Sequence, residues 1–131
     1  MILKNTLAVV FGLLFLSFVA VQYNDPDPAL WMVIYGLAAL FCFLSAAGKM
    51  PLGVLWLAAL SAVAGAIYMW PQHYEGISIG GGDIRNIEEA RESLGLFLVA
   101  GTLTALALLD KFYAQRSQRM QQKQKAKWAG R

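Results

Sequence analysis

The stretch Asn24-Asp25-Pro26-Asp27-Pro28 separates two long apolar segments and predicts a sharp corner between two helices. Proline fixes its own φ angle and disfavours the helical conformation in the residue before it, so Asp25 and Asp27 are expected to be extended. Asp27 is then predicted to cap the second helix, with Pro28 in its first turn. The two carboxylates and Asn24 also offer the oxygen ligands that a divalent cation prefers. The stretch therefore has two interpretations, a purely structural corner and a cation-binding site.

Four runs that are nearly free of charge surround this corner, and each approaches the length that spans a bilayer. They cover residues 6–23, 29–47, 52–70 and 93–109. A hydrocarbon core of about 30 Å takes roughly 17 to 25 helical residues, and in lipid every backbone amide must bond within its own segment. With 58% hydrophobic and 15% charged residues, the chain is too apolar for an ordinary soluble domain. The sequence predicts an all-α membrane protein, a four-transmembrane-helix bundle with a short extracytoplasmic cap of loop and helix.

Small residues repeat every four positions in the third and fourth runs. Ala58, Ala62 and Ala66 share one face of the third run, and Gly101 precedes Ala105 on the fourth. Such stripes let two helix backbones approach closely inside a membrane, where no hydrophobic effect drives helix association. We expect these stripes to pack helices of the same chain rather than to form a dimer interface.

Basic and acidic residues are divided between the two ends of the predicted helices. The amino end, the turn at 48–51 and the residues after 109 carry nine basic residues and one acidic residue, a net charge of +8. The opposite ends carry seven acidic and two basic residues, a net charge of −5. Because lysine and arginine are enriched on the cytoplasmic side, both termini are predicted to be cytoplasmic, in the plasma or inner membrane. Residues 1–110 then form the transmembrane domain and residues 111–131 a basic cytoplasmic tail.

The fourth helix is predicted to begin before its membrane span. Asp83 follows three glycines and is well placed as an N-cap, and a helical pattern runs from Ile84 to Leu109. At 1.5 Å per residue this pattern extends about 39 Å, which exceeds the bilayer core, so its first two turns should project outward. The tail beyond Asp110 has two interpretations, a continuation of the helix or a disordered segment.

The projecting turns carry a second group of candidate residues. Glu88 and Glu92 share one helix face and repel each other, and a bound cation or a nearby arginine would relieve the repulsion. A bundle brings the starts of the second and fourth helices to the same surface. Arg91 is therefore expected to face Asp25 or Asp27 and to lock the corner to the fourth helix.

Other residue types argue against several classes of function. Cys42 and His73 are the sole residues of their kinds, so the chain forms no internal disulfide and has no histidine pair for haem. No charged residue lies inside the four runs, which argues against an ion carrier or a proton relay. Lysine and arginine directly after a membrane helix favour anionic lipid head groups, and no nucleic-acid partner is predicted.

The motif Gln22-Tyr23-Asn24-Asp25-Pro26-Asp27-Pro28, followed by Trp31, Tyr35 and Gly36, resembles the transmembrane protein 220 family of small multi-pass proteins. The later string Glu88-Glu89-x-Arg91-Glu92-x-x-Gly95 fits the same resemblance, which covers most of the chain before residue 110. It implies an integral membrane protein and brings no established activity, cofactor or catalytic residue, so no site is transferred from it.

The favoured function is a non-enzymatic accessory subunit or scaffold with an acidic outer cap, whose partners are the lipid bilayer and another membrane protein. The alternative is a cation- or lipid-dependent membrane enzyme with clustered carboxylates. The third is a small-molecule carrier, which requires a polar cavity that reaches Tyr35 or Ser61. No catalytic residue and no cofactor is predicted, and a divalent cation would use Asp25, Asp27, Glu88 and Glu92. The candidate binding or structural residues are Asn24, Asp25, Asp27, Trp31, Tyr35, Glu88, Arg91 and Glu92.

Overall fold

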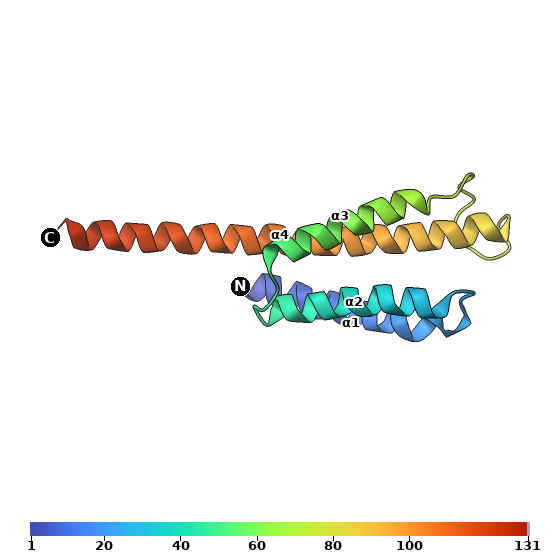
Figure 1. Cartoon of the computed structure of the whole chain (residues 1–131), viewed down its shortest axis with the longest axis horizontal. Helices are drawn as coiled ribbons and strands as arrows, with labels where there is room; N and C mark the ends of the chain where they lie inside the picture. Colours follow the sequence, from blue (N-terminus) through green and yellow to red (C-terminus); the bar gives the residue numbers. More distant parts are fainter. Residues whose placement is uncertain (131) are drawn as a thin grey trace.

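The computed structural model describes residues 1–130, which form four α-helices (Figure 1). Helix α1 covers Ile2–Val21 and continues into a short 3-10 helix, η1 (Gln22–Asn24); α2 covers Pro28–Ala46, α3 Leu52–Tyr68 and α4 Ile84–Ala129. Three segments, α1 with η1, α2 and α4, are long and apolar enough to cross a membrane. Helix α3 is a shorter apolar helix of 17 residues. The all-α prediction is confirmed.

Local sequence explains where the helices begin and end. Pro28 occupies the start of α2, as predicted, because the first turn of a helix does not need its missing N–H. Gly48 makes the turn after α2 with a φ angle of 72°, a conformation that glycine adopts without strain. Asp83 precedes α4, and its Oδ1 accepts a hydrogen bond from the Arg85 N–H at 2.9 Å, which confirms the predicted N-cap.

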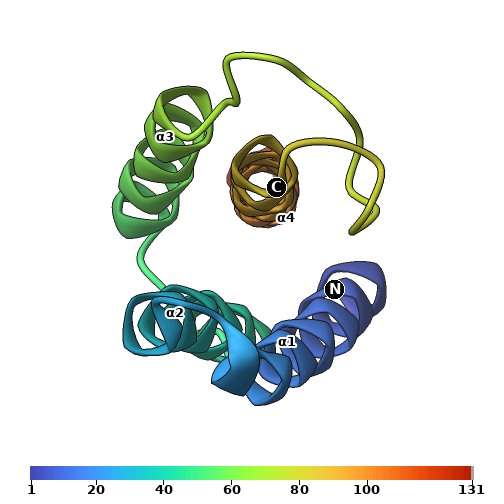
Figure 2. The same cartoon turned by 90° about the vertical axis from the view of Figure 1, so that its right-hand side faces the viewer.

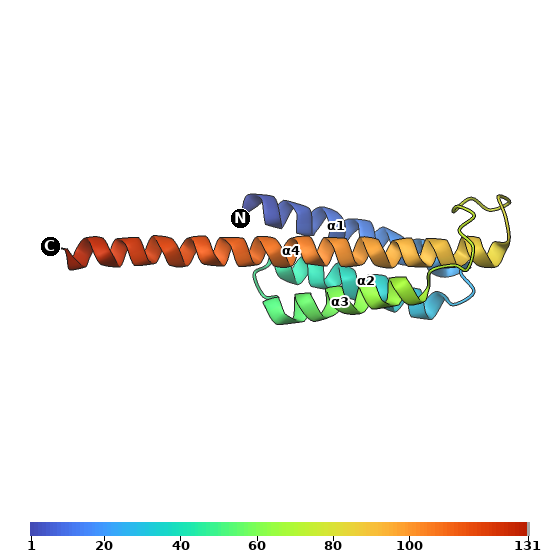
Figure 3. The same ribbon diagram turned by 90° about the horizontal axis from the view of Figure 1, so that it is seen from above.

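The helices form two antiparallel hairpins, α1 with α2 and α3 with α4 (Figure 1). Viewed along the long axis, α1, α2 and α3 lie around α4 (Figure 2). The N-terminus and the turn at 47–51 lie at one end of the bundle, here called the basic end (Figure 3). The corner and the loop of residues 70–83 lie at the other, here called the acidic end. The charge asymmetry of the sequence thus becomes an asymmetry between the ends of the folded molecule.

Within each hairpin the helices are in close contact. In the first hairpin Gly12 lies against the ring of Phe43, and a Cβ atom at this glycine would lie 2.8 Å from a ring carbon. In the second, Ala62 and Ala66 are buried where α3 packs on α4. Ser93 Oγ of α4 donates a hydrogen bond to the Ala66 carbonyl at 2.6 Å. The small-residue stripe of α3 therefore packs helices of the same chain, as predicted.

The two hairpins meet less closely than the helices within each hairpin. An apolar groove of about 270 Å³ lies between α1 and α4 and includes Phe11 and Gly101. A second groove, of about 310 Å³, lies among α2, α3 and α4 and includes Phe41 and Ser61. The Ser61 hydroxyl donates to the Leu57 carbonyl of its own helix. The space beside Ser61 is therefore apolar and is not the polar cavity that a carrier requires.

Three boundaries differ from the predicted spans. Helix α1 begins at Ile2, so Lys4 lies inside the helix rather than before it. Helix α3 ends at Tyr68 and not at residue 70, because the residue before Pro71 avoids the helical conformation. Helix α4 continues unbroken and straight to Ala129, because no glycine or proline interrupts residues 102–129 (Figure 3). The tail is thus helical. At residue 110 the composition changes from apolar to basic, but the helix does not end there.

Candidate functional site

A polar cavity lies at the acidic end, between the corner, α2, the loop of residues 70–83 and the start of α4. Its volume is about 520 Å³, and we call it the corner cavity. Seven of the eight candidate residues line it: Asn24, Asp25, Trp31, Tyr35, Glu88, Arg91 and Glu92. The eighth, Asp27, does not line the cavity. Residues that are up to 68 positions apart in the sequence are therefore brought together at one place.

The corner is held by Asp25 and not by Asp27. Asp25 has the predicted extended backbone, with φ −76° and ψ 147°, and its Oδ1 accepts a hydrogen bond from the Asp27 N–H at 2.9 Å. Asp27 occupies the N-cap position of α2, but its side chain makes no capping hydrogen bond. The predicted capping role of Asp27 is therefore wrong, because the Asp25 carboxylate bonds the backbone within the corner itself.

Two buried aromatic residues of α2 lie beside the carboxylates. Trp31 is 3% exposed and Tyr35 is 5% exposed. The ring of Tyr35 stacks on Phe15 at 6.2 Å between centroids and meets Phe18 edge to face at 5.2 Å. Its hydroxyl lies against Gly95 of α4, where a Cβ atom would overlap it. Phe15 therefore lies over one face of the Tyr35 ring, and Phe18 contacts the ring at a steep angle.

Neither aromatic side chain uses its polar group within the protein. Among residues 1–130, the Tyr35 hydroxyl and the Trp31 indole N–H make no hydrogen bond. Buried tyrosine and tryptophan usually find a hydrogen-bond partner for these groups. Both residues line the corner cavity, and neither polar group is fully enclosed by protein, so water or another molecule in that cavity can serve as the partner.

Glu92 is the most perturbed carboxyl group of the cavity. Burial, followed by the negative charges of Asp25, Glu88, Asp27 and Glu89, raises the pKa of Glu92 from 4.5 to about 7. The predicted repulsion between Glu88 and Glu92 is one of these contributions. A positively charged group in the cavity would favour the ionised carboxylate and lower this pKa again. Glu92 therefore stands among negative charges, and its pKa would report a positively charged group placed beside it.

Arg91 does not form the predicted ion pair. Within the described part of the chain no salt bridge joins it to Asp25 or Asp27. Its Nε instead donates to the Ile77 carbonyl at 2.7 Å. A neutral carbonyl accepts this bond without the desolvation of a second charge. The two terminal nitrogens of Arg91 make no hydrogen bond to residues 1–130, and Arg91 lines the same cavity as Asp25.

The loop of residues 70–83 is tied to α4 by two hydrogen bonds. Glu75 Oε2 accepts from the Asp83 N–H at 2.6 Å, at the point where α4 begins. The Arg91 side chain holds the Ile77 carbonyl about two turns further along α4. Between these attachments Ile79 reaches the wall of the corner cavity. Sequence inspection did not assign Ile79 or Glu75 to the site, because nothing in their local pattern shows that the loop folds over the corner.

The four carboxylates are not gathered into a metal centre. In the chain up to Gly130, no three histidine, cysteine, aspartate or glutamate side chains come together in a group that could hold a metal ion. Asp27 lies off the cavity, and the Asp25 carboxylate turns back onto the corner backbone. The expectation that both aspartates point toward one cation therefore fails on the geometry of the corner.

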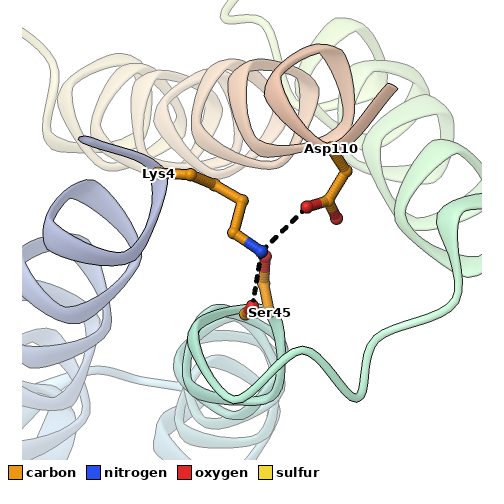
Figure 4. Close-up of polar contacts among 3 residues, drawn as sticks. All are labelled: Lys4, Ser45 and Asp110. Carbon is orange, nitrogen blue, oxygen red and sulfur yellow. Dashed lines mark hydrogen bonds and ion pairs between the residues drawn. The ribbon is translucent and has the colours of Figure 1, made fainter. Parts of the chain in front are cut away.

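A buried ion pair at the basic end was missed by the sequence analysis. Lys4 of α1 is 2% exposed, and its Nζ lies 2.9 Å from Asp110 Oδ1 of α4. The same Nζ donates to the Ser45 carbonyl of α2 at 2.9 Å (Figure 4). The pair joins the two hairpins at the end opposite to the corner cavity. The sequence offers one indication of this pair, because Asp110 is the single acidic residue at the basic end.

The apolar helices and the polar cavity at one end define a helical membrane protein with a ligand-sized site. The chain belongs to transmembrane family 220, whose family model, described as "Transmembrane family 220, helix", matches residues 14–108. The matched region includes the whole corner and every helix, in whole or in part, so the resemblance noted in the sequence is confirmed. Comparison with curated proteins and with solved structures finds no match.

Proposed function

We propose that this protein is a non-enzymatic membrane protein that binds a small organic cation in the corner cavity. The observation that carries the proposal is the composition of the lining. Three carboxylates, Asp25, Glu88 and Glu92, share it with a single basic residue, Arg91. The hydroxyl of Tyr35 adds a polar group that makes no hydrogen bond to residues 1–130. A protonated amine would satisfy these acceptors and offset the repulsion among the acids.

The proposal is tested with ethanolamine, which is a small primary amine, and with neutral ethylene glycol as the matched control compound. Calorimetric titration of the full-length protein in detergent micelles at pH 7.5 should show saturable binding of ethanolamine and none of ethylene glycol. The double variant D25N/E92Q should lose this binding. The variant D27N should keep it, because Asp27 belongs to the same corner but lies off the cavity. Absence of saturable ethanolamine binding, or equal binding by D25N/E92Q, would overturn the proposal.

We also propose that four transmembrane helices place the corner cavity on the extracytoplasmic side of the plasma or inner membrane, with both termini in the cytoplasm. The support is the net charge of +8 on the basic end against −5 on the acidic end. Helix α3, with 17 apolar residues, stands at the lower limit for a span. Fusion of a reporter that is active on one side of the membrane to the C-terminus tests this orientation, and extracytoplasmic activity would contradict it.

The basic tail is proposed to contact anionic lipid head groups through its first turns. Lys111 directly follows the membrane span, but α4 continues straight beyond it (Figure 1). At 1.5 Å per residue, Lys127 lies about 25 Å beyond Asp110, and the Debye length at physiological salt is about 8 Å. Charge-neutralising substitution of Lys111 and Arg116 should therefore weaken binding to anionic vesicles more than the same change at Lys125 and Lys127.

An accessory or scaffolding role is proposed for the acidic end as a whole. Three large apolar side chains of its loop, Tyr74, Ile77 and Ile79, are 55%, 48% and 70% exposed, outside the apolar part of the helices. Such exposure on a loop suits contact with a second membrane protein. Purification from the native membrane in a mild detergent, followed by mass spectrometry, tests the role. A stoichiometric protein companion that is lost on Ile79→Ser would support it, and a chain isolated without one would contradict it.

A small-molecule carrier is the second candidate, because the corner cavity reaches Tyr35, as such a function requires. Below Tyr35 the hairpin interface is filled by Phe15 and other apolar side chains. Passage would therefore require the hairpins to separate. Uptake of labelled ethanolamine into proteoliposomes would support transport, and binding without uptake would leave the protein as a binding protein.

A further inference from the structure

The carboxylates that line the corner cavity share it with the guanidinium group of Arg91. Arg91 uses Nε for the Ile77 carbonyl, and its two terminal nitrogens make no hydrogen bond to residues 1–130. These two nitrogens form the edge of the guanidinium that binds a phosphate or carboxylate with two parallel hydrogen bonds. One hydrogen bond to the loop thus orients Arg91 and leaves its anion-binding edge available.

The cavity therefore presents both signs of charge to one occupant. Glu88 and Glu92 lie one helical turn apart on α4, and Arg91 stands beside them on the same helix. Asp25 adds a third carboxylate from the corner. A simple cation would leave the guanidinium unused, and a simple anion would meet three carboxylates. A ligand with an ammonium group and an anionic group satisfies both.

From this juxtaposition we infer that the corner cavity binds a phosphoethanolamine zwitterion, with its ammonium beside the carboxylates of Asp25 and Glu92 and its phosphate on Arg91. The inference deepens the proposed function and rests on it, since it adds the anionic half of the ligand. Phosphoethanolamine exists as a free molecule and as a lipid head group, and both present the same chemistry to these residues.

A primary ammonium fits the cavity better than a quaternary one. A quaternary ammonium carries no N–H and is bound chiefly by open aromatic faces. Tyr35 offers little open ring surface, because it is 5% exposed and Phe15 stacks on its ring. Trp31 is buried as well, at 3% exposure. Carboxylate oxygens accept hydrogen bonds from a primary ammonium, so phosphoethanolamine is preferred over phosphocholine.

The position of the cavity is compatible with a lipid as the source of the head group. It lies where α4 passes from its polar first turns, which carry Glu88 and Glu92, into its apolar part after Ser93. The apolar groove between α1 and α4 lies further along the same helices and includes Phe11 and Phe97. An acyl chain attached to the phosphate would meet apolar surface along these helices.

The test compares four compounds on the full-length protein in detergent micelles: ethanolamine, phosphoethanolamine, phosphocholine and dihexanoyl phosphatidylethanolamine. Phosphoethanolamine should bind about tenfold more tightly than ethanolamine, the gain expected for hydrogen bonds to a charged group. It should also bind about tenfold more tightly than phosphocholine. The dihexanoyl lipid should bind more tightly than the free head group if a lipid is the source, and equally if the free molecule is.

Variants separate this inference from the proposed function. R91Q should remove the phosphate gain, so that this variant binds phosphoethanolamine no more tightly than it binds ethanolamine. R85Q is the matched control, because Arg85 is an exposed arginine on the same helix that lies off the cavity, and it should bind all four compounds as the wild type does. A melting temperature measured for R91Q shows whether the loop stays attached. The conservative variant R91K should retain part of the phosphate gain whether or not that temperature falls.

Two outcomes overturn the inference while the proposed function stands. In the first, phosphoethanolamine binds no more tightly than ethanolamine. In the second, phosphocholine and phosphoethanolamine bind with equal affinity. If none of the four compounds binds, the inference and the proposed function both fail. Loss of the phosphate gain in R85Q as well as in R91Q would also overturn the inference, since the effect would then not belong to the cavity.

Discussion

Replacing Glu92 with glutamine should remove a dependence of stability on pH that the wild-type protein shows between pH 4.5 and 7. The pKa of Glu92 is raised from 4.5 to about 7 in the folded protein, first by burial and then by the carboxylates around it. Within this window the folded state binds more protons than the unfolded state. The free energy of unfolding therefore falls as pH rises, and it levels off above pH 7.

The size of the effect follows from the shift. Each pKa unit corresponds to about 1.4 kcal/mol, so the full displacement would amount to about 3 kcal/mol. Because Glu92 is only half-buried, solvent screening reduces the charge contributions, and we expect about 1 to 2 kcal/mol. Glutamine has nearly the same shape and never ionises. The E92Q variant should therefore match the wild type below pH 4.5 and exceed its free energy of unfolding by this amount at pH 8.

The assay is unfolding of both proteins in the same detergent micelles at pH 5, 6, 7 and 8, with the difference between them plotted against pH. Glu89→Gln serves as the control, since Glu89 is a neighbouring half-buried carboxylate of α4 and the last of the charges that act on Glu92. Its difference curve should be much flatter. A wild-type and an E92Q protein with the same pH dependence would refute the reasoning, because the perturbed carboxyl group would then lie elsewhere.

Three further predictions concern contacts between the helices. Lys4→Met should lower the free energy of unfolding by about 3 kcal/mol, because it leaves the Asp110 carboxylate partly buried without its partner. The double variant K4M/D110L should recover most of this loss. An unchanged free energy of unfolding in the single variant would show that the ion pair contributes nothing. Gly95→Ala should cost about 1 to 3 kcal/mol, because the new methyl group overlaps the Tyr35 hydroxyl, and Tyr35→Phe in the same chain should relieve the cost; melting temperatures check both. Ser93→Ala should cost about 1 kcal/mol through loss of its hydrogen bond to α3, and unchanged denaturant unfolding would contradict that.

Much of the fold follows from patterns that the sequence displays directly. Apolar runs of membrane-spanning length predict helices, because a helix makes all the hydrogen bonds of its backbone within one segment and lipid offers no other partner. The start of α2 at Pro28 and the start of α4 after Asp83 were predicted from local stereochemistry alone, and both are confirmed. The tail was left between two interpretations, because helix propensity without tertiary contacts does not decide between them.

The sequence analysis named seven of the residues that line the corner cavity, but it did not predict their contacts. Asp25 and Asp27 were singled out as possible oxygen ligands, and Glu88 and Glu92 as a repelling pair on one helix face. Trp31 and Tyr35 were singled out because they follow the corner in the motif that resembles the family. Their partners were predicted less well. Asp27 does not cap α2, and Arg91 bonds Ile77 rather than Asp25. Such bonds depend on differences of a few ångströms between segments that are distant in the chain, and residue spacing carries no information at that scale.

The sequence by itself determined that this chain is helical and which of its segments are apolar. It also determined where the corner turns and how charge divides between the two ends. Each of these properties depends on residues that are close together along the chain. The tertiary structure alone decided that Asp25, Tyr35, Arg91 and Glu92 line one cavity. It also decided that Lys4, read from the sequence as a flanking charge, is buried against Asp110. Both outcomes depend on how two hairpins are placed against each other. That placement is the sum of many weak packing contacts over the whole interface, and no single motif encodes it.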